Sequence, residues 1–184
     1  MKFLLTIVAF AGLSLSGCSK TTEQGAIDQD SSGSKITRSK TVTGSGSTAI
    51  ETKVDEANGG VRIRVTASGI AAGPHGMHVH EIGRCDGPAF TSAGAHWNPT
   101  SKKHGRNNPA GAHLGDLNNL VIGPDGRGSA ELLIPGARLN DGSQPLFDDD
   151  GAALLIHAAA DDYRTDPGGD SGDRILCAVL QGAK

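Results

Sequence analysis

The stretch Val61-Arg-Ile-Arg-Val65 decides the class of fold, because apolar and polar residues alternate along it without a break. Successive side chains of a strand point to opposite faces, so a period of two predicts a half-buried β-strand. Gly59 and Gly60 precede the stretch and Gly69 follows it, and such glycines mark the turns that bound a strand.

Further short strands are predicted along the rest of the chain. Residues 120–122 and 127–134 are apolar-rich and are joined by the turn sequence Gly-Pro-Asp-Gly, while residues 153–156 and 175–180 are short apolar runs. Residues 41–52 are rich in Thr and Ser and predict a strand or a hairpin. No stretch after the N-terminal segment has the period of 3.6 that marks an amphipathic helix. Many short strands with Gly and Pro turns predict an all-β sandwich or barrel.

Composition excludes several classes of protein. The chain has 184 residues, which corresponds to one domain and some surplus. Its apolar fraction of 36% is too low for a multi-span membrane protein, and its 27 glycines are too many for a helical bundle. The formal net charge is −3, so the basic character of a nucleic-acid binder is absent and we predict no nucleic-acid partner.

The N-terminus has the pattern of an export signal. Lys2 precedes an apolar stretch over residues 3–15, which suits a signal peptide and is too short to span a bilayer. This stretch leads into Leu15-Ser-Gly-Cys18, which resembles the bacterial lipobox. The resemblance implies that residues 1–17 are removed and that Cys18 carries the lipid; an ordinary signal peptide with an incidental cysteine is the alternative.

The predicted lipid anchor at Cys18 is followed by a polar segment. Residues 18–40 are rich in Ser, Thr, Gln, Gly and charge, so we expect a flexible tether, with the folded domain over residues 41–184. The protein is then exported and reaches the membrane through its lipid. Because Ser19 rather than Asp follows Cys18, the periplasmic side of the outer membrane is favoured if the cell is Gram-negative.

Two cysteines remain once Cys18 is assigned to the lipid. An export signal implies an oxidising compartment, where Cys85 and Cys177 are expected to form a disulfide. The alternative, two separate free thiols, is unfavourable in that compartment.

Two long segments interrupt the predicted strands and contain most of the polar chemistry. Residues 83–117 are rich in Gly, Pro and Asn, and residues 158–173 are acidic and glycine-rich. Loops of this length in a compact domain are usually functional.

Histidines gather in and beside these segments. His78 and His80 are two residues apart on an apparent strand, so both side chains reach one face and can bind one ion. Other candidate ligands follow along the chain: His96, His104, His113, Asp116 and His157. Three His with one Asp suit tetrahedral zinc, whereas a site of imidazoles alone suits Cu(II). Scattered surface histidines are the alternative.

The chain resembles copper/zinc superoxide dismutases at four motifs in the family's order. Gly76-Met-His-Val-His-Glu-Ile-Gly83 is similar to G-F-H-V-H-E-x-G. The second block, Ser92-Ala-Gly-Ala-His-Trp-Asn-Pro99 with His104-Gly105, resembles S-A-G-x-H-F-N-P-x-x-x-x-H-G. His113-Leu-Gly-Asp-Leu117 resembles H-x-G-D-L, and Gly172-Asp-Arg-Ile-Leu-Cys177 resembles G-x-R-x-A-C.

This resemblance implies the fold and the metal ligands. The fold is a Greek-key β-sandwich or barrel of about eight antiparallel strands with two long functional loops. The implied copper ligands are His78, His80, His96 and His157. The implied zinc ligands are His96, His104, His113 and Asp116, so that His96 bridges one copper and one zinc per subunit.

Three further residues receive roles from the resemblance or by elimination. Asp161 falls where the family has a carboxylate between a copper-ligand and a zinc-ligand imidazole; a solvated acid is the alternative. Arg174 matches the arginine at the mouth of the copper channel; a surface arginine is the alternative. His75 is left over, and we expect it to make structural hydrogen bonds.

The implied activity is the dismutation of superoxide to O2 and H2O2, with His96 and Arg174 as catalytic residues, protecting the cell envelope. The second loop is unusually acidic for an enzyme with an anionic substrate, and Lys102, Lys103 and Arg106 are candidates for a compensating positive field. The alternative function is a copper/zinc-binding lipoprotein without significant turnover. The sequence leaves monomer and homodimer open.

Overall fold

The computed structural model describes residues 27–29, 35–42, 48–143 and 145–180, which form an all-β chain without an α-helix. One short 3-10 turn, η1, covers Thr91–Ala93. The strands have these bounds: β1 Ile27–Gln29, β2 Lys35–Val42, β3 Ala49–Ala57, β4 Gly60–Ser68, β5 Gly73–His75, β6 Met77–His80, β7 Leu120–Ile122, β8 Arg127–Pro135, β9 Ala152–His157 and β10 Arg174–Leu180.

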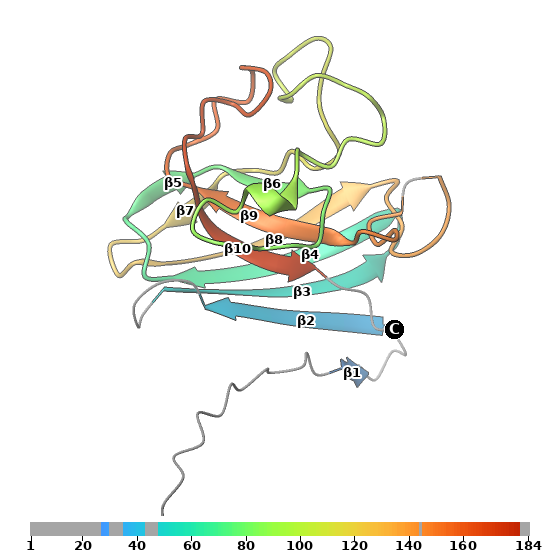
Figure 1. The fold of residues 1–184 in the computed structure, drawn as a ribbon, viewed down its shortest axis with the longest axis horizontal. Helices are drawn as coiled ribbons and strands as arrows, with labels where there is room; N and C mark the ends of the chain where they lie inside the picture. Colours follow the sequence, from blue (N-terminus) through green and yellow to red (C-terminus); the bar gives the residue numbers. More distant parts are fainter. Residues whose placement is uncertain (1–26, 30–34, 43–47, 144, 181–184) are drawn as a thin grey trace, which may run out of the picture.

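The strands form antiparallel sheets that pack face to face. The larger sheet has the order β1-β2-β3-β4-β8, a second has the order β10-β9-β6, and β5 pairs with β7. In Figure 1 the two long loops rise above β6 and β9, and β2 and β3 lie below. β8 pairs with β4, and β9 with β6, although other strands separate them in the chain, and such crossovers are the Greek-key arrangement. The predicted fold class is confirmed.

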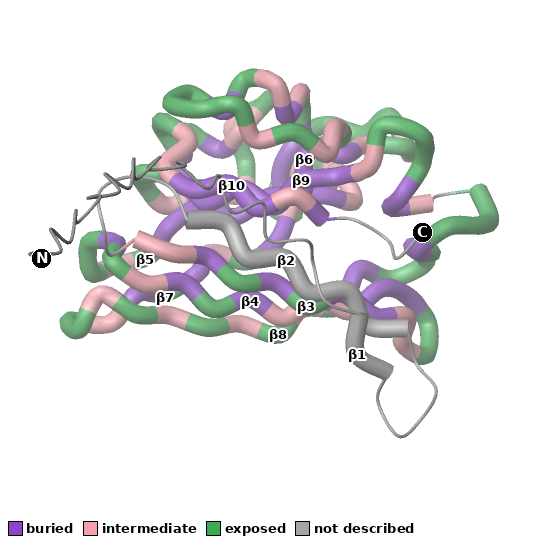
Figure 2. The backbone as a smooth tube through the Cα atoms, turned by 60° about the horizontal axis from the view of Figure 1, so that its bottom comes forward, coloured by how far each residue is buried: buried purple, intermediate pink, exposed green. Residues whose placement is uncertain are grey.

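The core explains why these segments form strands. Val61, Ile63 and Val65 of β4 are buried, and the arginines between them are partly exposed, as the alternation predicts. β9 is buried along its whole length, as the purple tube in Figure 2 shows. Leu154 and Ile156 face the main core, whereas Leu155 packs with Phe90 from the first long loop. A strand covered on both faces appears in the sequence as an uninterrupted apolar run.

The expected tether over residues 18–40 needs correction, because it contains strand. β1 and the first part of β2 lie within it, and β2 pairs with β3 from Thr37↔Val54 to Val42↔Ala49. The expectation rested on missing hydrophobic periodicity, but strands also pair through backbone hydrogen bonds, which every residue except proline can donate and which leave no such period. The sheet therefore begins before residue 41.

Two other predicted segments differ in detail. Residues 41–52 are divided between the end of β2 and the start of β3, which pair as a hairpin. Residues 120–122 and 127–134 are joined by a turn as predicted, but β7 pairs with β5 and β8 with β4. The predicted signal peptide and Cys18 lie outside the described residues. Within those residues no helix has the length and apolar character to cross a membrane.

Candidate metal centre

Strand β6 and its two neighbours bring the histidines together. The side chains of His78 and His80 are fully buried and project from the same face of β6. β9 pairs with β6 along one edge and ends at His157. Along the other edge, isolated bridges join Asp116 to His78 and His96 to His80. Ligand candidates from two strands and one loop therefore meet at the same end of the sheet.

The first cluster contains the four expected copper ligands. One ring nitrogen from each lies within 4.8 Å of the others, and all four side chains are buried: His78, His80, His96 and His157. Three buried nitrogens in this cluster have no hydrogen-bond partner: His78 Nδ1, His80 Nε2 and His157 Nε2. A buried polar atom without a partner is costly, so three that converge indicate a place for a ligand.

Hydrogen bonds on the opposite side of each ring fix the tautomers. His80 Nδ1 lies 3.0 Å from the carbonyl oxygen of Gly94, and His157 Nδ1 lies 3.0 Å from that of Gly172. A carbonyl oxygen can only accept, so each Nδ1 carries the proton and each Nε2 has a free lone pair. His78 Nε2 lies 2.8 Å from an oxygen of Asp161, which leaves its Nδ1 free. Three lone pairs aimed at one point fit a copper ion.

The second cluster contains the four expected zinc ligands. The Nδ1 atoms of His96, His104 and His113 lie 2.9, 3.0 and 3.0 Å from Asp116 Oδ1. The other carboxylate oxygen accepts from the backbone N–H groups of Gly105, at 2.8 Å, and His113, at 3.0 Å. Backbone donors thus orient the carboxylate, and three imidazoles with one carboxylate fit tetrahedral zinc.

His96 belongs to both clusters. Its Nδ1 lies in the Asp116 cluster, so its Nε2 is the nitrogen available to the first cluster. The ring stacks on that of His78, with centroids 4.0 Å apart. One imidazole can therefore join two ions.

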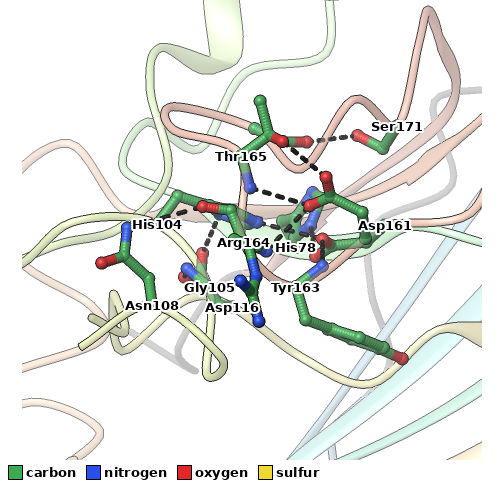
Figure 3. Close-up of polar contacts among 12 residues, drawn as sticks. His78, His104, Gly105, Asn108, Asp116, Asp161, Tyr163, Arg164, Thr165 and Ser171 are labelled. Carbon is green, nitrogen blue, oxygen red and sulfur yellow. Dashed lines mark hydrogen bonds and ion pairs between the residues drawn. The ribbon is translucent and has the colours of Figure 1, made fainter. Parts of the chain in front are cut away.

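Asp161 contacts one histidine of each cluster, and Figure 3 shows it together with His78 and His104. One oxygen is 2.8 Å from His78 Nε2 and the other is 3.0 Å from His104 Nε2. The Tyr163 backbone N–H also donates to this carboxylate, at 2.6 Å. A carboxylate that accepts from two imidazoles fixes the orientation of both rings.

Burial sets the protonation of the first cluster. It lowers the pKa of His78 to about 4, against the hydrogen bond to Asp161, and that of His80 to about 2. Burial also lowers the pKa of His96 and of His157. These rings are therefore neutral near pH 7, which metal binding requires.

The second cluster is more strongly charged. Burial opposes a charge on His104, but hydrogen bonds to Asp116 and Asp161 outweigh it and raise the pKa of His104 to about 9. Burial acts against both carboxylates, but their imidazole partners outweigh it and hold the pKa of Asp116 and of Asp161 well below the usual range. Without metal, protonated imidazole is thus favoured where the zinc would lie, so binding should release a proton.

Arg174 stands beside the first cluster. It is in register with His157, and its guanidinium donates to the carbonyl oxygens of Phe90 and Gly94, both at 2.8 Å. Gly94 also accepts from His80, so Arg174 holds the loop segment that orients this ligand. Burial lowers the pKa of Arg174 from a value so high that the group stays charged.

The expected disulfide is present. Cys85 of the first long loop is bonded to Cys177 of β10, with 5.7 Å between their Cα atoms. Cys177 packs with Phe90 and Ala93 in a small apolar cluster. The bond therefore fixes the start of the loop that carries His96 to the strand that carries Arg174.

Several charges near the centre are already engaged. Lys103 pairs with Asp166 at 2.9 Å, and Asp166 also accepts the backbone N–H of His104 at 2.8 Å. The Asp162 carboxylate accepts hydrogen bonds from the backbone N–H and the hydroxyl of Thr165, in the turn that follows it. The acidity of the second loop thus partly serves to hold the loops together, and Lys103 is not a free cation.

His75 makes hydrogen bonds with both ring nitrogens. Its Nδ1 lies 2.7 Å from the His157 carbonyl oxygen and its Nε2 lies 2.9 Å from the Ala71 carbonyl oxygen, in agreement with a structural role.

Some residues that hold the centre were missed by sequence reasoning. The Asn119 side chain accepts from the backbone N–H of Asp161 at 2.8 Å and donates to its carbonyl oxygen at 3.0 Å. Gly169 packs directly against Asp161 and His104. The adjacent glycines at 168 and 169 are a signal for a turn but not for this contact. No sequence pattern indicates that the Gly94 and Gly172 carbonyl groups orient copper-ligand candidates.

Together, the fold and the site define a class of protein: an antiparallel β-sandwich in which two long loops enclose a paired histidine–carboxylate metal centre beside a partly buried arginine. The sequence pattern of the family described as "Copper/zinc superoxide dismutase (SODC)" matches residues 45–180. The chain belongs to this family, whose members bind copper and zinc.

The similar proteins include proteins named Cu-Zn superoxide dismutase and a relative named superoxide dismutase-like. A superoxide dismutase-like protein of Bacillus subtilis, YojM, is 45% identical over 67% of this chain, and the match spans 64% of that protein's length. The Cu-Zn superoxide dismutase 1 of Aquifex aeolicus is 41% identical over 68% of this chain and 76% of its own. A crystal structure of a superoxide dismutase-like protein from Bacillus subtilis superposes with a TM-score of 0.72 at 36% identity, covering 85% of this chain and all of the other.

Proposed function

We propose that this protein dismutates superoxide to O2 and H2O2 at a copper centre joined through His96 to a structural zinc. The observation that carries the proposal is the set of three buried imidazole nitrogens without partners, converging beside His96 and Arg174. Copper would be held by His78, His80, His96 and His157 and would supply the one-electron couple by which one superoxide is oxidised to O2 and a second, taking up two protons, is reduced to H2O2. Zinc would be held by His96, His104, His113 and Asp116 and would do no redox work.

The residues of the chain supply orientation, charge and a proton site. Asp161 and the carbonyl groups of Gly94 and Gly172 hold the rings so that their lone pairs stay aimed at one ion. His96 can hold a proton at Nε2 and return it, while Nδ1 stays in the zinc cluster. Arg174 contributes a permanent positive charge for docking an anion.

The rival function is metal binding without significant turnover. It is favoured by the name of the Bacillus subtilis relative, which is called superoxide dismutase-like. In this chain every expected ligand position is filled and Arg174 is present. These residues support turnover over simple storage.

A series of substitutions at Arg174 tests turnover directly. We expect Arg174→Ala to retain copper and zinc and to lower the rate constant for superoxide about tenfold, or ~1.4 kcal/mol. Arg174→Glu is expected to lower this rate constant further, because the carboxylate repels the anion. Arg174→Lys is expected to lower it less, because the positive charge is kept. Pulse radiolysis on metal-replete protein measures the rates, with Arg127→Ala in β8 as the matched control.

Two results would contradict the proposal. Equal rates for all Arg174 variants and the wild type would remove Arg174 from the reaction. A wild type that holds both metals but does not accelerate superoxide decay would leave the rival function standing.

We also propose that the protein is exported and attached to the cell envelope by a lipid on Cys18. The support is the lipobox-like sequence, which stands before the first strand at Ile27. Cys18→Ser is expected to release or mislocalise the protein while the purified domain keeps its activity. Detergent partitioning and mass spectrometry of the mature protein provide the measurement; an unlipidated N-terminus at another residue would contradict the anchor.

A further inference from the structure

Tyr163 connects the second loop to two separate points of the chain between β6 and β7. Its hydroxyl accepts the backbone N–H of Asn119 at 2.8 Å, and its carbonyl oxygen accepts that of Asn107 at 2.9 Å. The guanidinium carbon of Arg106 lies 3.7 Å from the centroid of the tyrosine ring. Arg106 also donates to the side-chain oxygen of Asn118. The ring and this cation thus join the turn after His104 to the chain after Asp116.

The backbone around Tyr163 is shaped for these contacts. Tyr163 has a φ of 61°, which is rare for a bulky residue and is adopted where surrounding contacts require it. Gly105 lies so close to the Tyr163 carbonyl group that a side chain at position 105 would overlap it. Tyr163 also donates its backbone N–H to Asp161, the carboxylate that contacts His78 and His104.

From these contacts we infer that Tyr163 and Arg106 form a clamp that closes the zinc half of the centre and limits the rate of zinc release. The inference rests on the proposed zinc site. His104 and Asp116 are almost completely buried, so zinc can leave only when the two loops separate locally. The clamp opposes that separation, because Tyr163 belongs to the second loop and its partners Arg106, Asn107 and Asn119 belong to the chain between β6 and β7. Tyr163 is a positioning residue and contacts no metal ligand through its ring.

The clamp should slow the release of zinc more than the release of copper. Two copper-ligand candidates, His80 and His157, are held by carbonyl groups of Gly94 and Gly172, which the clamp does not contact. A general loosening of the fold would instead release both metals faster by the same factor. The ratio of the two release rates therefore separates a clamp from a merely structural tyrosine.

The test uses protein loaded with copper and zinc and an excess of a chromophoric zinc chelator. We expect Tyr163→Leu to speed zinc release about tenfold, since it loses the hydroxyl and the stacked ring. Tyr163→Phe keeps the ring and should speed zinc release about fivefold. Arg106→Leu should speed zinc release about threefold, whereas Arg106→Lys should release zinc at close to the wild-type rate. Arg164→Leu is the matched control, because Arg164 is exposed and its contacts with the first loop in the described structure are made by its backbone.

Two further measurements complete the design. In the double variant Arg106→Leu/Tyr163→Leu, zinc release should be no faster than in Tyr163→Leu, because the two side chains share one interaction. Copper release should change less than zinc release in every variant. If Tyr163→Leu does not fold, Tyr163→Phe and Arg106→Leu decide the question.

The clamp is overturned if zinc leaves Tyr163→Phe and Arg106→Leu at the rate of the control, or if copper and zinc release rise together. A wild type that takes up no zinc overturns the proposed function as well. A wild type that binds zinc, with equal release rates in all variants, overturns the clamp alone.

Discussion

His96→Ala is expected to disrupt both metal sites at once and to lower superoxide dismutation at least about 100-fold, or ~2.7 kcal/mol in the barrier. The reason is that His96 belongs both to the candidate copper set and to the candidate zinc set of the described residues. Its loss leaves three candidate ligands on each side. It also removes the ring stacked on His78 and one imidazole partner of Asp116.

Metal content after dialysis against a weak chelator, together with the copper EPR spectrum, measures the effect. His113→Ala is the matched control, because His113 belongs to the zinc set alone; it should lose zinc and keep copper with some activity. If His96→Ala loses zinc but holds copper as tightly as the control does, His96 does not join the two ions.

Gly169→Ala is expected to weaken zinc binding about 10- to 100-fold, although residue 169 is not a ligand. A methyl group on Gly169 would overlap the Asp161 oxygen that contacts His104 and would stand 2.7 Å from His104 Nε2. Asp161 must then move, and it releases His104 on one side and His78 on the other. The backbone φ of +66° adds a strain of about 1–2 kcal/mol for any residue with a Cβ.

Gly59→Ala separates strain from overlap. Gly59 has a φ of +88°, and a methyl group there meets nothing within 4 Å. Both variants should lose about 1–2 kcal/mol of unfolding free energy through the backbone, and only Gly169→Ala should also lose zinc. Denaturant titration and zinc competition measure the two quantities. Equal zinc affinity in the two variants would show that Asp161 needs no fixed position.

Much of the fold and the list of candidate ligands could be predicted before the structure was known. The alternation at Val61, Ile63 and Val65 predicts a half-buried strand because side chains in a strand have a period of two. The same rule places His78 and His80 on one face. β1 and the part of β2 before residue 41 were missed, since strand pairing depends on backbone groups and not on a side-chain pattern.

By itself, the sequence determined the all-β class, the candidate ligand types and the pair of cysteines, because these depend on local periodicity and on the chemistry of single side chains. Only the tertiary structure decided which nitrogen of each histidine is free, since this depends on carbonyl groups of Gly94 and Gly172 that lie far from their partners in the chain. The closeness of Gly169 to Asp161 and the stacking of Arg106 on Tyr163 were likewise decided there. Each joins segments whose separation in space is set by the packing of the sheets and not by any local pattern.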